Sequence, residues 1–171
     1  MHRNEFIDGG NPLLSTQTRS SETQKKISLS RLRTFSTIIL VLLAAQFLVG
    51  MLVNLFVQVP AVHPGANAPE YFSGVVQGVA WALVHAPLWL QVHSILGLLL
   101  FIASLVLIGF AIAARQRAWI IISVIGLFGI MAGGFNGASF MNYGHDFSSL
   151  LMSICFLLAA IPYIIGLSLS H

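Results

Sequence analysis

Residues 34–59 read TFSTIILVLLAAQFLVGMLVNLFVQV and contain no Asp, Glu, Lys or Arg. A helix needs about 20 predominantly apolar residues to cross the hydrocarbon core of a bilayer. The apolar region of a cleavable signal peptide is only about 7–15 residues long, so this run is too long for one. We therefore expect residues 34–59 to form a retained transmembrane helix.

The composition of the chain agrees with a membrane protein. Of the 171 residues, 57% are hydrophobic and 8% are charged, and the mean hydropathy is +0.88. A soluble domain carries about 25% charged residues. These values argue against a soluble enzyme, a disordered chain and a nucleic-acid-binding protein. Cys155 is the only cysteine, which rules out a disulfide within the chain.

Three more apolar segments of spanning length follow. Pro87 suits the first turn of a helix, where its missing N–H costs no hydrogen bond. Arg115 and Arg117 mark a tight turn, and the sequence NYGHD marks a later polar turn. We expect the further spans to cover residues 88–114, 118–140 and 146–169. The predicted fold is all-α, an integral membrane four-helix bundle over residues 34–170.

The basic residues predict the orientation. All eight Lys and Arg lie either before the first span or between the second and third, which puts them on one side of the membrane. The positive-inside rule makes that side cytoplasmic. We expect both termini to be cytoplasmic and the chain to lie in the plasma membrane. Residues 1–33 are rich in polar and charged residues, and we expect a mostly disordered basic tail.

The first outer loop, residues 60–86, has a pattern of its own. Apolar residues recur near helical spacing after Pro69. We expect a short amphipathic helix here, either on the outer membrane surface or as a lid over the bundle. His63, in the Pro-rich part of this loop, is expected to be solvated.

Two histidines are expected at a similar depth on different spans. His93 lies roughly 9 Å inside the second span, at 1.5 Å per residue, and His145 opens the fourth. Helix bundles build cofactor and metal sites from facing side chains, and haem iron accepts imidazole nitrogen. We predict that His93 and His145 ligate a b-type haem and that Gly97, one turn beyond His93, leaves room for the porphyrin. Asp146 is a candidate to hydrogen-bond the ring of His145.

Two stripes on the spans have both a packing and a ligand-binding interpretation. Gly129, Gly133 and Gly137 recur at every fourth position, which lets helices approach closely or leaves room for a flat ligand. Gln46 and Asn54, with Gly50 between them, form a polar stripe that should face other helices, because an unpaired amide is costly in lipid.

The sequences QFLVG at 46–50 and VHSILG at 92–97, together with His145, resemble one half of the heme A synthase family. This resemblance implies a four-helix bundle with a short helix in its outer loop and haem-ligating histidines on the second and fourth spans. The chain departs from that family in having one half rather than two. It also has Ser94 where the family has Arg, Asp146 where it has Leu, and no clear counterpart of the family's functional carboxylate near the outer side. The resemblance therefore implies a b-type haem site more than the synthase reaction.

Three functions remain open at this point. The first is a haem-binding membrane protein that transfers electrons or handles haem, with a redox partner. The second is a haem-free accessory or structural subunit. The third is a small proton- or metal-linked transporter or sensor that uses His85, His93, His145 and Asp146. The chain has no nucleophile–base pair, phosphate loop or paired carboxylates, so we do not expect an enzyme. The lipid bilayer is the one expected partner common to all three, and a homo-oligomer is left open.

Overall fold

The computed structural model describes residues 12–169, and the side chains of residues 27–145 and 147–169. Its helices are α1 (Pro12–Phe56), α2 (Tyr71–Val84), α3 (Leu88–Ala113), α4 (Arg117–Tyr143) and α5 (Asp146–Leu169). No strand occurs among the described residues. The predicted all-α fold is confirmed.

Four of the helices are long and apolar enough to cross a membrane. The stretches concerned are Ile27–Phe56, Leu88–Ala113, Arg117–Tyr143 and Phe147–Leu169. The last three lie close to the predicted bounds. The stretch Arg117–Tyr143 runs slightly past the predicted end at residue 140, because the helix is terminated only by Gly144, whose φ of 67° suits a residue without a side chain. The chain is therefore an integral membrane protein by the length and composition of its helices.

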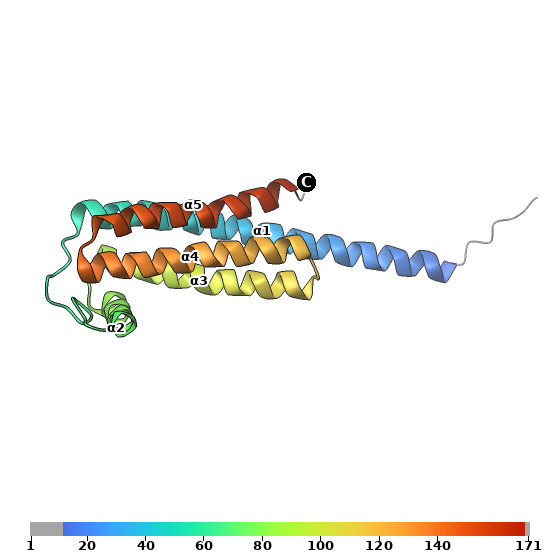
Figure 1. Cartoon of the computed structure of the whole chain (residues 1–171). Coiled ribbons are helices and arrows are strands. Elements are labelled where there is room, and N and C mark those ends of the chain that lie inside the picture. Colours follow the sequence, from blue (N-terminus) through green and yellow to red (C-terminus); the bar gives the residue numbers. More distant parts are fainter. Residues whose placement is uncertain (1–11, 170–171) are drawn as a thin grey trace, which may run out of the picture.

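Helix α1 begins well before the predicted first span. Residues 12–33 are helical rather than a disordered tail, and α1 projects beyond the other helices in Figure 1. Pro12 suits the first helical turn, and no Pro or Gly occurs between Pro12 and Gly50. Extending an existing helix costs far less than nucleating one, so the polar segment continues the apolar span. Residues 1–11 lie outside the described part of the chain.

The four long helices form a ring around a common core (Figure 1). Helix α1 packs against α3 and α5, and α4 packs against the same two helices. Away from α2 this core is closed by buried side chains from all four helices, among them Leu43, Leu107, Trp119 and Tyr163. The hydroxyl of Tyr163 donates a hydrogen bond to Ser104 Oγ there, at 3.3 Å. We call this part the packed half.

Residues 57–86, which include α2, fold over the other end of the ring, and we call them the cover. Helix α2 packs against α3 and α4, and Figure 1 shows it lying across the end of the bundle. Asn142 Nδ2 donates to the carbonyl oxygen of Gly74 at 3.0 Å, and the hydroxyl of Tyr143 donates to that of Ala68 at 3.2 Å. The predicted short helix is confirmed and packs on α3 and α4, while its placement relative to the membrane surface stays a prediction.

Candidate functional site

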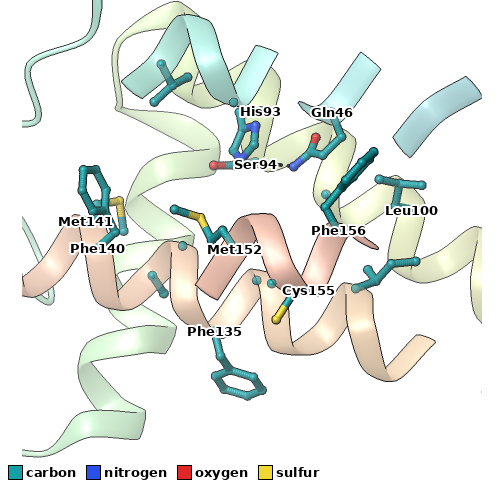
Figure 2. Close-up of a pocket in the computed structure, with 18 of the residues that line it drawn as sticks. Gln46, His93, Ser94, Leu100, Phe135, Phe140, Met141, Met152, Cys155 and Phe156 are labelled. Carbon is teal, nitrogen blue, oxygen red and sulfur yellow. Dashed lines mark hydrogen bonds between the residues drawn. The ribbon is translucent and has the colours of Figure 1, made fainter. Parts of the chain in front are cut away.

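The half of the bundle next to the cover contains a pocket of about 530 Å³ (Figure 2). All five helices contribute to its wall. Small-molecule sites typically have volumes of about 300–1,000 Å³. No Asp, Glu, Lys or Arg is among the described residues that line it. Its polar side chains are all formally neutral: Gln46, Asn54, His93, Ser94, Ser149 and Ser153.

His93 lies in the wall of this pocket, where α3 faces α1. Its Nε2 is 3.2 Å from Nε2 of Gln46, and Figure 2 shows this hydrogen bond beside Ser94. The amide can donate only if His93 Nε2 is the unprotonated nitrogen, which places the ring proton on Nδ1. His93 Nδ1 and Gln46 Oε1 are buried without a hydrogen-bond partner. The pair therefore has one unused donor and one unused acceptor.

Each of these two polar residues packs against a glycine of the opposite helix. A Cβ atom on Gly50 would lie 2.9 Å from Cε1 of His93, and one on Gly97 would lie 3.3 Å from Nε2 of Gln46. Helix α1 runs toward the cover and α3 runs away from it. Each helix carries a polar residue followed four positions later by a glycine. Because the two helices are antiparallel, the polar residue of each packs against the glycine of the other. The arrangement explains both the QFLVG and the HSILG sequences.

Gly97, predicted to leave room for a porphyrin, thus lies beside the amide of Gln46. It also lines the pocket, so part of the residue faces open space.

The glycine stripe of α4 contributes to both packing and the pocket. A Cβ atom on Gly126 would overlap the ring of Tyr163, and one on Gly129 would lie 2.7 Å from the backbone nitrogen of Ala159. These two glycines let α5 approach α4 closely. Gly133 and Gly137 line the pocket, and Cβ atoms there would meet only Cys155 Cβ at 3.6 Å and Met152 Sδ at 3.3 Å. Gly129 lines the pocket as well, so packing and pocket lining overlap along the stripe, and the flat ligand stays a prediction.

His145 is not brought together with His93 in the described pocket. It is exposed, it follows the helix-ending Gly144, and its ring stacks on Tyr143 with centroids 6.2 Å apart. It is not among the residues that line the pocket. The side chain of Asp146 lies outside the described side chains, so its predicted bond to His145 stays a prediction.

Two other histidines take different positions in the cover. His85 is exposed and caps the C-terminal end of α2. His63 is buried and stacks on Trp81, so the expectation of a solvated His63 is wrong. Its nitrogens contact backbone carbonyl oxygens of Pro64 and Met141, and Met141 lies far away in the sequence. No local pattern could have predicted that contact.

Met152 and Cys155 of α5 line the pocket, although neither is among the predicted ligand residues. Figure 2 shows Met152 projecting into the pocket on the side that faces His93. The available signal was that both residues fall on the face of the helix that turns away from lipid. Such a position is equally typical of ordinary core packing. Among the described residues, no group of three or more His, Cys, Asp or Glu side chains could hold a metal ion.

No protein-family model, curated protein or solved structure matches this chain significantly.

Proposed function

We propose that this integral membrane protein holds a hydrophobic ligand in the pocket, with His93 as the polar anchor. The observation that supports this is an ionisable side chain within a membrane span, in the wall of a cavity of ligand size. Ionisable residues inside spans are costly and are therefore functional candidates by default. The uncharged wall favours a ligand that is neutral where it is buried, since it offers no counter-ion.

A b-type haem is the ligand to test first, because the sequence predicts it and resembles one half of the heme A synthase family. The imidazole of His93 and the thioether of Met152 both line the pocket, and both group types bind haem iron. His93 Nε2 would have to exchange its contact with Gln46 for the iron. The lining residues fit one imidazole ligand but include neither His145 nor a basic residue for the propionates. Bound haem would supply one-electron chemistry.

Absorption spectra test the haem proposal. The protein is purified in mild detergent, with and without added haemin, as wild type and as the His93→Leu and His145→Leu variants. Haem binding predicts a Soret band that His93→Leu removes. If His145 is the second ligand, His145→Leu converts the spectrum from six-coordinate to five-coordinate. If it is not, His145→Leu leaves the spectrum unchanged, as the exposed-residue control His85→Leu should. Unbound haemin, which has a Soret band of its own, is removed by gel filtration before each spectrum, and a wild-type protein without a Soret band would then exclude haem.

Ligand extraction distinguishes a pocket that holds a ligand other than haem from a pocket that holds no ligand. Organic extracts of wild type and His93→Leu are compared by mass spectrometry. A neutral lipid-soluble compound that is enriched in the wild type and depleted in the variant supports the general proposal. Equal extracts contradict it.

The haem-free accessory subunit is the second candidate, and a specific observation favours it. The glycine packing of Gln46 and His93 gives both residues a structural role without any ligand. This candidate predicts that His93→Leu weakens contact between α1 and α3, while the native mass spectrum of each protein shows only the mass of its own polypeptide without a ligand.

A further inference from the structure

The first part of α2 presents three different faces. Successive residues of a helix are about 100° apart, so residues three, four or seven positions apart share a face. One face packs on α4 through Gly74 and Gly78, which are buried. A second face, which we call the apolar face, carries Phe72 and Val76, and these residues are 66% and 68% exposed. Exposed apolar surface of this kind marks a contact with a membrane or with another protein.

The third face is a polar strip that consists of Glu70, Ser73 and Gln77. Nε2 of Gln77 donates a hydrogen bond to Oγ of Ser73 at 2.9 Å. The carboxylate of Glu70 forms the N-cap of α2 and accepts hydrogen bonds from the backbone nitrogens of Phe72 and Ser73. All three residues of the strip are exposed. Because a charged side chain is costly inside the hydrocarbon, this strip requires water.

The apolar face lies beside the membrane-spanning part of α4. The ring of Phe72 meets the ring of Phe135 edge to face, with centroids 6.4 Å apart, and the hydroxyl of Tyr71 lies 2.7 Å from Oγ of Ser139. The 27 residues of α4 rise about 40 Å, and the hydrocarbon core is about 30 Å thick, so a centred helix extends about 5 Å beyond it at each end. Phe135 lies about 12 Å before the helix end at Tyr143 and is therefore inside the hydrocarbon. Ser139 lies at its boundary.

The apolar face also continues the exposed surface of α4. Phe128, Met131 and Phe135 share one face of this span and are all exposed. Figure 2 shows the ring of Phe135 on the side of α4 that points away from His93. The contact with Phe135 extends this surface onto Phe72 of α2. Continuity with the exposed face of a span favours lipid as the partner of the apolar face.

We infer that the first part of α2 lies within the bilayer leaflet nearest the cover, with its apolar face among the lipid chains and its polar strip in water. An interfacial helix buries its apolar face at the boundary between headgroups and acyl chains in this way. The stacked rings of Tyr71 and Tyr143, with centroids 6.2 Å apart, then lie at the headgroup level that Tyr favours. The inference depends neither on the ligand of the pocket nor on the orientation of the chain.

This placement also brings the pocket to the leaflet. Val79 and Leu83 continue the apolar face along α2, and both line the pocket. A cover in water would put this part of the wall in contact with the aqueous phase. A cover in the leaflet puts it in contact with lipid, where lipid-soluble molecules are dissolved.

Nitroxide labels test the placement. Single cysteines replace Val76 or Gln77 in a Cys155→Ser background, and the labelled full-length chain is reconstituted in phosphatidylcholine vesicles. Electron paramagnetic resonance measures how often each label collides with oxygen, which concentrates in hydrocarbon, and with a water-soluble nickel chelate. Phe128→Cys, at a residue that is 64% exposed on a span, gives the reference for lipid. Val62→Cys, at a loop residue that is 91% exposed, gives the reference for water.

The two neighbouring positions should behave differently because they lie on different faces. We expect the ratio of oxygen to nickel collisions to be several-fold higher at Val76→Cys than at Gln77→Cys, and to approach the ratio at Phe128→Cys. A ratio at Val76→Cys equal to that at Val62→Cys would place the helix in water and overturn the inference. Rare collisions of Val76→Cys with both reagents would overturn it as well, since a second copy or another protein would then cover the apolar face.

A second pair of positions guards against a variant that does not fold. Phe72→Cys and Ser73→Cys make the same comparison one turn earlier, between the apolar face and the polar strip. We expect the higher ratio at Phe72→Cys, and equal ratios at the two positions would contradict the placement.

Discussion

Gly50 of α1 lies so close to His93 of α3 that a Cβ atom on residue 50 would be 2.9 Å from Cε1 of the imidazole and 3.4 Å from Nδ1. The ring therefore rests on the backbone of the neighbouring helix. The same helix holds the ring from one turn earlier, through Gln46. The glycine and the amide together fix where the imidazole can lie in the pocket wall.

Adding a methyl group at Gly50 should destabilise the helix pair. We expect Gly50→Ala to lower the free energy of unfolding by about 1–3 kcal/mol, the usual range for an overpacked core. The measurement is SDS-induced unfolding in mixed micelles, followed by circular dichroism. Gly109→Ala, also in a span, is the matched control, because a Cβ atom there has no neighbour within 4 Å. Equal effects of the two substitutions would contradict the close contact.

The hydrogen bond between Gln46 and His93 should appear as an energetic coupling. In a double-mutant cycle with Gln46→Leu and His93→Leu, we expect a coupling of about 0.6 kcal/mol and at most about 1.7 kcal/mol, as for other interhelical bonds in membranes. The same unfolding assay supplies the four free energies. Strictly additive effects would mean that the two side chains do not interact.

The ring of Tyr163 should contribute more stability than its hydroxyl. The residue is fully buried, its ring fills the space left by Gly126, and its hydroxyl donates to Ser104. Tyr163→Phe loses one hydrogen bond, which costs about 0.5–1.5 kcal/mol. Tyr163→Ala also leaves a cavity, and large aromatic truncations cost about 3–5 kcal/mol. Unfolding free energies that do not separate the two variants would contradict the packing of this half.

Cysteine labelling tests the predicted orientation in the plasma membrane. In a Cys155→Ser background, Val62→Cys places a thiol on the cover at a residue that is 91% exposed. Ala118→Cys places one beside Arg117, at an exposed position on the opposite end. An impermeant maleimide added to intact cells should label residue 62, and residue 118 only after permeabilisation. The reverse pattern would reverse the topology.

The spans could be predicted from the sequence because hydropathy and helix-ending residues are local. Pro87 and Gly144 sit at or next to helix ends, and each acts through its own backbone. The helical start of α1 was missed because composition alone does not register that a polar segment continues an existing apolar helix.

The site could be predicted only in part because its contacts join distant residues. Local spacing identified His93 and the residues beside it as unusual, but it could not show that Gln46 would lie over Gly97. It placed His145 at the correct helix end without revealing that the side chain lies outside the pocket. The burial of His63 depends on Met141, 78 positions later, and no periodicity links them.

The packed half closes one end of the pocket. Leu100 lines the pocket and belongs to the closed core, which continues through Leu107 and Tyr163 toward the far end. A hydrated ion entering the pocket would have to shed water beside a wall without formal charge, at a cost of several kcal/mol. No through-route follows from this shape. A molecule held in the pocket therefore cannot pass along the axis of the bundle to the far end.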